Sequence, residues 1–341
     1  MKTITTRACR IVCLILILLG NTPVYAGADV EPVPRIARYA GDRVAAASFT
    51  FDDGPQSHAG IARTFDSYGI KATFFVVAGW VPDAHEVGPK ARLSWPELRT
   101  MALSGHEIGS HSMTHVSLQN ITNEEVLAKE IDSSFDRIAK GTGKAPVSFA
   151  YPFCKSNPTV RERVMRRYVA ARGYHPLYEG NCSASQARQW IDKALTDGGW
   201  HVYLSHGIDI DALRAHLDDI VPLRDRLWIA PYGEVAAYCS ARDKAVLTAI
   251  IRDTSRCSFT LTLPEGSSEI LSRTPLTVVI PASGSTPSSP VACDPPQRAL
   301  TLESRTDSVF VILLPGRDPV TVTWQKPMGA QKSGIVAPLR L

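Results

Sequence analysis

The sequence predicts an α/β protein: an incomplete, distorted (β/α)7 barrel followed by a small all-β, sandwich-like domain. Between residue 45 and about residue 245, short apolar runs alternate with amphipathic segments, and repeated βα units of this kind build a parallel sheet. After about residue 250, β-rich runs with alternating polarity follow one another without intervening helices. We therefore expect a leader at 1–26, the barrel at 27–250 and the β-rich domain at 251–341.

Seven apolar runs are the predicted strands of the barrel. Each is short and is followed by a turn signal or an amphipathic segment, as expected for strands of a parallel sheet. These runs are Val44–Phe51, Ala72–Val77, Glu107–Ser110, Val147–Tyr151, Tyr168–Ala171, His201–Leu204 and Leu227–Ala230.

Helix start signals fall between these runs. Ser94–Glu97 and Thr122–Glu125 both fit the capping box, and Asn157–Pro158 starts another helix. For Arg161–Arg172 the periodicity does not decide between one helix and a helix that runs into a strand.

Five further runs form the predicted C-terminal domain, with a Pro/Ser/Gly loop at Pro281–Pro290. A carbohydrate-binding module and a packing module are both compatible with this pattern, and the lack of clustered Trp or Tyr residues favours packing. The runs are Ser258–Leu263, Leu276–Ile280, Leu300–Glu303, Ser308–Leu314 and Val320–Trp324.

Two motifs carry the chemistry of the barrel. Asp52 and Asp53 end the first run at a Gly-Pro turn, and His111 and His115 follow the third run. The i, i+4 spacing of the histidines would place both rings on one face of a helical turn. Two histidines and one carboxylate form a metal site with open positions, and the second carboxylate can move a proton, which is hydrolytic chemistry. Alone, the Asp-Asp-Gly-Pro run would also fit a solvated turn.

The positions of the motifs support a shared site. In α/β barrels the chemistry lies at the carboxyl ends of the strands. Besides the aspartates and histidines, Phe153 follows the fourth run and His206 follows the sixth. Four motifs at one rim indicate a catalytic site.

Four blocks resemble, in order, the conserved blocks of the polysaccharide deacetylase family, the NodB-homology fold of chitin, peptidoglycan and acetylxylan deacetylases. The resemblance spans roughly residues 45–240. The blocks are Thr50–Pro55, His111–His115, Phe149–Phe153 and Leu204–Gly207.

The resemblance implies a role for eight residues. They are Asp53, His111 and His115 as ligands of a divalent ion such as Zn²⁺ or Co²⁺, Asp52 as general base, His206 as general acid, Phe153 as oxyanion donor through its backbone N–H, and Tyr151 and Pro152 as substrate contacts.

The chain departs from the family pattern at three places. The third block commonly begins with an arginine that orients the catalytic aspartate, but this chain has Ala150 there, and Cys154 stands where glycine is common. The group that holds the base is therefore not identified by the sequence. The family's fourth block, an Asp near a Trp, has its nearest equivalent at Asp192.

The N-terminus predicts a cleaved secretory signal. Lys2, Arg7 and Arg10 precede an apolar run at Ile11–Leu19, which is too short to span a bilayer, and Val24–Ala26 fits a cleavage site. A membrane anchor is the alternative. Cleavage would remove three positive charges and lower the formal net charge from +4 to +1, so nothing indicates nucleic acid as a partner. We expect a secreted or periplasmic protein without stable membrane insertion.

Five cysteines remain after the leader, and an oxidising compartment permits disulfides. We expect Cys154 to pair with Cys182 and Cys257 to pair with Cys293, which leaves Cys239 as a free thiol. Connectivity does not follow from sequence.

The expected function is that of a secreted, metal-dependent carbohydrate deacetylase whose partner is an acetylated polysaccharide or oligosaccharide, most readily one with N-acetylglucosamine. An O-acetyl esterase of the acetylxylan type and a catalytically weak glycan-binding protein are the alternatives. A glycoside hydrolase would need two carboxyl groups separated across the sugar, which an adjacent Asp pair does not provide. The glycan, the native metal and the oligomeric state stay open.

Overall fold

The structure is a computed structural model that describes residues 33–173, 182–252, 256–281, 288–305 and 307–325. The predicted leader at 1–26 lies outside these residues. All of the described residues fall within one compact unit, Pro32–Leu341. None of the helices found in these ranges has the length and apolar character needed to cross a membrane.

A seven-stranded parallel sheet forms the first part of the chain, and the seven predicted strands are confirmed. Its order is β6-β5-β4-β3-β2-β7, and β8 pairs with β2. No ladder among the described strands joins β6 to β7 or β8, so the barrel is incomplete. The strands are β2 (Ala45–Asp52), β3 (Thr73–Val76), β4 (Glu107–Ser110), β5 (Ser148–Ala150), β6 (Ala170–Arg172), β7 (Trp200–Ser205) and β8 (Leu227–Ile229).

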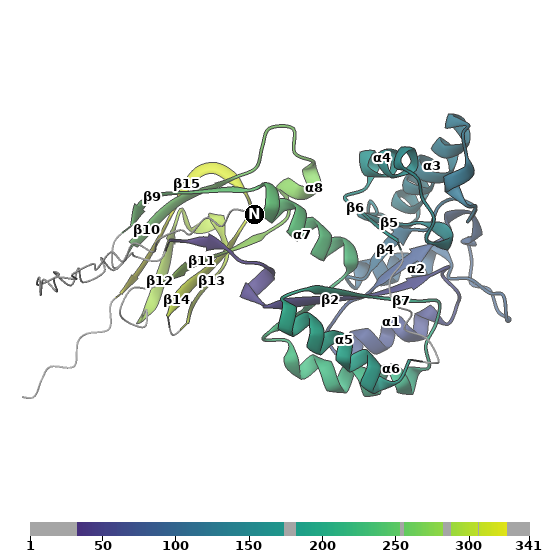
Figure 1. Ribbon diagram of the computed structural model, residues 1–341, viewed down its shortest axis with the longest axis horizontal. Helices are drawn as coiled ribbons and strands as arrows, with labels where there is room; N and C mark the ends of the chain where they lie inside the picture. The colour runs from purple at the N-terminus through teal and green to yellow at the C-terminus, as the bar shows by residue number, and fades with distance from the viewer. Residues whose placement is uncertain (1–32, 174–181, 253–255, 282–287, 306, 326–341) are drawn as a thin grey trace, which may run out of the picture. The chain divides into compact units, whose positions relative to one another are not determined.

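Within the described residues, six helices connect these strands. Figure 1 shows α1, α5 and α6 together on one side of β2 and β7, where they close over a buried aromatic core. Within it the rings of Phe49 and Tyr203 stack at 4.3 Å. Burial of each such side chain stabilises the fold by about 1.5–3 kcal/mol. The helices are α1 (His58–Ser67), α2 (Trp95–Leu103), α3 (Glu124–Thr142), α4 (Pro158–Arg167), α5 (Ala184–Asp197) and α6 (Ile210–Ile220).

The predicted helix starts are correct in two of three cases. In the capping box of α2, Glu97 accepts from the backbone N–H of Ser94 at 2.8 Å and from its hydroxyl at 2.6 Å. At α3 the predicted Thr122 cap is wrong by one residue, because the short Asn123 side chain reaches the backbone N–H of Val126 at 3.1 Å.

The segment that the periodicity left undecided is a helix followed by a strand. Asn157 caps α4 by accepting from the N–H of Val160 at 2.8 Å. The helix ends at Arg167, and β6 begins at Ala170. The last residue of β6 is therefore Arg172, at the same strand-end edge as the other motifs.

Two four-stranded antiparallel sheets, of order β1-β11-β14-β13 and β12-β15-β10-β9, form the β-rich part of the chain. All five predicted strands are present, and β9, β12 and the N-terminal β1 join them. The strands are β1 (Arg35–Ile36), β9 (Val246–Arg252), β10 (Arg256–Thr262), β11 (Leu276–Pro281), β12 (Ser288–Asp294), β13 (Ala299–Arg305), β14 (Ser308–Leu313) and β15 (Gly316–Gln325).

The β-rich part and the barrel share one apolar core. Figure 1 shows α7 (Tyr232–Lys244) between the parallel sheet and the antiparallel sheets. Trp228 and Tyr238 pack in one buried cluster with Phe259 and Trp324. This shared core supports a packing role for the β-rich part. A short helix, α8, and the 3-10 segments complete the described structure: α8 (Glu269–Ser272), η1 (Ala40–Asp42), η2 (Ala78–Trp80), η3 (Leu118–Asn120), η4 (Pro152–Cys154), η5 (Val221–Leu223) and η6 (Pro296–Arg298).

Candidate metal centre and active site

The parallel register brings the predicted motifs to the carboxyl edge of the sheet. Phe51 on β2 pairs with Ser205 on β7, so Asp52 and His206 follow at the same level on neighbouring strands. His111 extends β4, and its backbone N–H donates to the carbonyl of Val76 on β3 at 2.9 Å. The expected rim is therefore formed by residues from at least four strands.

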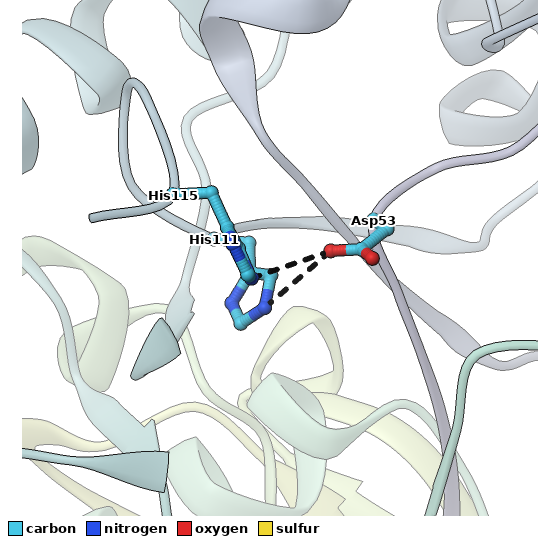
Figure 2. Close-up of side chains that lie close together, drawn as sticks. All are labelled: Asp53, His111 and His115. Carbon is cyan, nitrogen blue, oxygen red and sulfur yellow. Dashed lines mark ion pairs between the residues drawn. The ribbon is translucent and has the colours of Figure 1, made fainter. Parts of the chain in front are cut away.

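Asp53, His111 and His115 converge on one point (Figure 2). The Oδ1 atom of Asp53 lies 3.5 Å from Nε2 of His115 and 3.7 Å from Nε2 of His111, and the three ligand atoms lie within 4.8 Å of one another. In a tetrahedral zinc site, donors about 2.0–2.1 Å from the ion stand about 3.3 Å apart. Asp53 Oδ1 is buried, and no hydrogen-bond donor in the described part of the chain satisfies it.

The ring of His111 is oriented for ligation. Its Nδ1 lies 2.8 Å from the carbonyl oxygen of Ala150, so Nδ1–H donates there and the lone pair of Nε2 faces Asp53. Metal-binding histidines are usually fixed through the second nitrogen in this way. Burial lowers the pKa of His111, which favours the neutral ring that binds metals. The residues present therefore fit a divalent cation.

The loop between the two histidines is not helical, so the predicted helical turn is wrong. Ser112 has φ +67° and His115 has φ +62°, both in the left-handed region that non-glycine residues seldom adopt. The hydroxyl of Ser112 accepts from the backbone N–H of His115 at 3.0 Å and holds this bend. The histidines converge through loop shape and not through helical spacing.

Glu130 shapes the same loop, and sequence reasoning missed it. This buried carboxylate of α3 accepts from the N–H groups of Met113 at 3.1 Å and Thr114 at 2.9 Å, and from the Thr114 hydroxyl at 2.6 Å. A signal was available, because Glu130 stands between Leu127 and Ile131 on the apolar face of a predicted amphipathic helix. A carboxylate in that position needs polar partners.

Arg172 supplies the guanidinium that the family pattern places at position 150. It lies opposite Ala150 in the β5–β6 register, and its Nη2 donates to Oδ2 of Asp52. The side chains are 0% and 5% exposed, and the guanidinium lies 5.1 Å from the centre of the Phe75 ring. The sequence did not reveal this residue because the end of β6 could not be located from periodicity.

The environment of Asp52 favours its ionised form. Burial alone would raise the pKa of this carboxyl group, but the positive charge and hydrogen bond of Arg172 outweigh burial and hold the pKa below its usual value. A carboxylate that is ionised and oriented at neutral pH suits a general base.

Two further contacts support Asp53. Its backbone has φ +73°, and its carbonyl oxygen accepts from Nη1 of Arg92 at 2.9 Å. The Arg92 guanidinium lies 4.6 Å from the centre of the Trp80 ring, and that ring lies 5.3 Å from His115. Arg92 and Trp80 therefore border the metal centre on the side of the Asp53 turn. Neither was identified from the sequence.

Three residues predicted to belong to the site lie at the end of β5 and in the loop after it, and they differ in exposure. Phe153 is 58% exposed, and its ring lies 4.7 Å from His115. Tyr151 and Pro152, predicted to bind substrate, are both buried, and Tyr151 packs in an apolar cluster with Phe149. Among these three residues, only Phe153 presents its side chain to solvent. Its φ of +59° is a strained conformation of the kind found at functional sites.

His206 is exposed at the end of β7. Its carbonyl oxygen lies 3.0 Å from Nε2 of His58 on α1. Desolvation lowers the pKa of His58 to about 4, so the neutral His58 ring donates this hydrogen bond and holds the main chain at His206. Asp192, the nearest equivalent of the family's fourth-block aspartate, accepts from Arg188 at 2.8 Å, and both residues lie on α5.

The predicted disulfides do not form. All five cysteines after the leader lie in the described ranges, and no disulfide joins any two of them there. Cys257 and Cys293 both pair with Val322, from opposite sides of β15. Two strand spacings place them about 10 Å apart, beyond the reach of a disulfide. Cys154 lies at the rim in η4, whereas Cys182 packs against the main core of the barrel.

A known protein family matches the part of the chain that carries the two aspartates and the two histidines of the site. Residues 41–170 match the family described as polysaccharide deacetylase, and they contain Asp52, Asp53, His111 and His115. The match to the polysaccharide deacetylase family is confined to this segment, which is less than half of the chain. The segment ends two residues before Arg172, so the family match does not include the residue that holds Asp52.

Curated relatives match over limited lengths. Chitin deacetylase 1 of Cryptococcus neoformans var. grubii is 33% identical over 114 residues, 33% of this chain and 22% of that protein. A peptidoglycan-N-acetylglucosamine deacetylase of Listeria monocytogenes is 32% identical over 123 residues, 34% of this chain and 23% of that protein. Gellan lyase of a Bacillus species is 24% identical over 294 residues, 72% of this chain and 11% of that protein. The chain thus spans between about a tenth and a quarter of these relatives.

Among solved structures, a family 4 acetyl xylan esterase from Clostridium thermocellum, in complex with a cobalt ion, is 26% identical with a TM-score of 0.43. The match covers 56% of this chain and 89% of that one.

Proposed function

We propose that this protein is a metal-dependent carbohydrate deacetylase that removes N-acetyl groups from a glycan containing N-acetylglucosamine. The observation that carries the proposal is the convergence of Asp53, His111 and His115 beside a buried Asp52 that Arg172 holds in place. Three ligands and an adjacent ionised carboxylate are the parts that hydrolysis by an activated water requires.

Each residue has a defined part in this reaction. A divalent ion held by Asp53, His111 and His115, Zn²⁺ in our proposal, would supply Lewis-acid activation of a water and of the acetyl carbonyl. Asp52 accepts the proton of the attacking water, and His206 donates a proton to the departing nitrogen. The backbone N–H of Phe153 stabilises the negative charge that develops on the carbonyl oxygen.

The names of the relatives favour an amide substrate. The chitin and peptidoglycan-N-acetylglucosamine deacetylases are each above 30% identical to this chain, over 114 and 123 residues. An O-acetyl ester of the acetylxylan type is the second candidate, because the same residues can hydrolyse an ester. A glycan-binding protein without turnover is the third. It is disfavoured because Arg172 provides the support that Ala150 cannot.

We also propose that the protein acts outside the cytoplasm. The basic start, the short apolar run at Ile11–Leu19 and the small residues at Val24–Ala26 support a cleaved leader. Sequencing the N-terminus of the protein recovered from the periplasm or the medium tests this directly. A mature chain that still begins at Met1 would contradict it.

Acetate release from defined substrates tests the function. Purified protein is incubated with N-acetylchitooligosaccharides, peptidoglycan and acetylxylan, with and without chelator, and then with added Zn²⁺ or Co²⁺. We expect release from an N-acetylated glycan that stops with chelator and returns with the metal. Release only from acetylxylan would shift the assignment to the ester. No release by folded, metal-loaded protein would favour the binding protein.

A further inference from the structure

A cavity lies at the end of the parallel sheet opposite the metal centre. It has a volume of about 440 Å³ and begins at Glu107, the first residue of β4, whereas His111 follows the last residue of the same strand. Most of its wall is apolar, with Ala102, Ile108, Val147, Ala237 and Ile270 contributed by the barrel, α7 and α8. Its volume and its lining are those of a small-molecule site.

Two carboxylates line this cavity, and only one of them is hydrogen-bonded. Glu107 accepts from the Thr73 hydroxyl at 2.8 Å, the Ser148 hydroxyl at 2.7 Å and the N–H of Gly233 at 2.7 Å. Glu107 thus joins β3, β4, β5 and the start of α7. Glu234, the next residue of α7, has neither a hydrogen bond nor an ion pair within the described residues, and its side chain is exposed.

The electrostatics leave Glu234 without a counter-ion. Although the side chain reaches solvent, the surrounding cavity wall removes part of its hydration and raises the pKa of its carboxyl group, and the nearby charge of Glu107 raises it further. Of the basic residues in the wall, Lys144 donates to the carbonyl of Ala102 at 2.6 Å, and Arg273 pairs with Glu269 at 2.8 Å. An acidic group in a largely apolar cavity is stabilised when a cation enters, because opposite charges attract more strongly where water is excluded.

We propose that this cavity binds a small organic cation, an ammonium group on an alkyl or aryl body, with the carboxylate of Glu234 as its counter-ion. The apolar walls take up the body of the ligand, and Glu234 selects its charge. An anionic ligand would be repelled by Glu234 and Glu107, although Lys144 stands in the same wall, and a neutral one would gain nothing from the Glu234 carboxylate. The site is separate from the metal centre and does not depend on the function proposed above.

A pair of ligands with the same shape tests the charge preference. Choline and 3,3-dimethylbutan-1-ol differ in charge but hardly in shape, and a quaternary ammonium group cannot bind a metal ion, so the metal-loaded full-length protein is used. Titration calorimetry or saturation-transfer NMR measures both affinities. We expect choline to bind about tenfold more tightly, equivalent to about 1.4 kcal/mol.

Three variants locate the effect. Glu234→Gln should make the affinities for choline and 3,3-dimethylbutan-1-ol similar. Glu162→Gln, at an exposed glutamate of α4, should leave the preference for choline unchanged. Ala145→Trp, at an exposed position in the cavity wall, should weaken both ligands. Equal affinities in the unmodified protein, a preference that persists in Glu234→Gln, or no binding at millimolar concentration would each overturn the proposal. Acetate release should be the same in Glu234→Gln, which separates this test from that of the active site.

Discussion

Arg172 donates a hydrogen bond to Asp52 although the two residues lie on strands separated by three others in the sheet order. In a flat sheet, strands four steps apart are about 19 Å from each other. An arginine side chain cannot bridge that distance. The contact therefore forms only because the sheet curls and brings the end of β6 toward β2, and the incomplete barrel is a condition for holding the base.

Replacement of Arg172 should change the pH dependence of the reaction. Because Arg172 lowers the pKa of Asp52, Arg172→Gln should raise that pKa and move the acid limb of kcat/KM to higher pH. Loss of orientation should reduce turnover by about 10²-fold. Bound metal, measured by atomic emission, should stay. Arg167→Gln, at a surface ion pair of α4, is the control.

A swap of positions separates this role from a loss of folding. Removal of one partner from a buried ion pair can cost about 3–5 kcal/mol, so Arg172→Gln alone could simply destabilise the protein. The double variant Ala150→Arg/Arg172→Ala returns the arginine to the position that it has in the family pattern. We expect it to recover turnover and the acid limb relative to Arg172→Ala. A double variant that folds but stays inactive would argue against an orienting role.

The fold was largely predictable from the sequence because strand and helix periodicities are local. All seven parallel strands and five of the antiparallel strands were found at or near their observed bounds. The pairing of β1 with β11 was not predicted, because a two-residue strand carries no periodicity and its partner lies more than two hundred residues away. The predicted Cys257–Cys293 disulfide was wrong for a related reason. The order of strands in the sheet determines whether two cysteines are neighbours, and β15 lies between these two.

Residues that belong to a short sequence motif could be found from the sequence, whereas residues placed by the shape of a loop or by a contact across the fold could not. The sequence located Asp52, Asp53, His111, His115 and His206, all of which lie at the carboxyl edge of the sheet. It misjudged the loop at Ser112, because left-handed conformations leave no trace in the spacing of residues. It missed Arg172, Glu130 and Arg92, because each acts across the fold on a motif elsewhere in the chain.

Substitutions of the two adjacent aspartates should affect different properties, metal binding in one case and turnover in the other. Asp53→Ala removes the carboxylate that lies within 3.7 Å of both histidine Nε2 atoms, so it should lose most of the bound metal. Asp52→Asn keeps a similar shape and should retain metal while it loses turnover. Metal content and acetate release are measured on the same preparations. Equal metal loss in both variants would contradict the division of roles.

Glu97 should contribute an acid-sensitive part of the stability. Burial would raise its pKa, but the hydrogen bonds from Ser94, Gln56 and His85 outweigh burial and bring it to about 2. A carboxyl group whose pKa is lower in the folded state stabilises the fold at pH values above its pKa in the unfolded state, which is about 4.3. This contribution is lost as the pH falls toward the pKa of the folded state. Urea unfolding between about pH 5 and pH 2 should therefore show a steeper loss in the unmodified protein than in Glu97→Gln. Parallel pH profiles would contradict this.

Glu130 should control metal affinity through the shape of the loop that it holds. It accepts three hydrogen bonds from Met113 and Thr114, between the two histidine ligands, and an amide in its place would turn an N–H group toward donors that need an acceptor. Glu130→Gln should therefore weaken metal binding by about 10–100-fold, in the range seen when groups that orient metal ligands are changed. Competition with a chromophoric chelator measures the affinity. Glu125→Gln, at an exposed position on the same helix, is the matched control. A purely structural role would lower the melting temperature of the metal-free protein and leave the affinity of the folded protein unchanged, and that result would overturn the prediction.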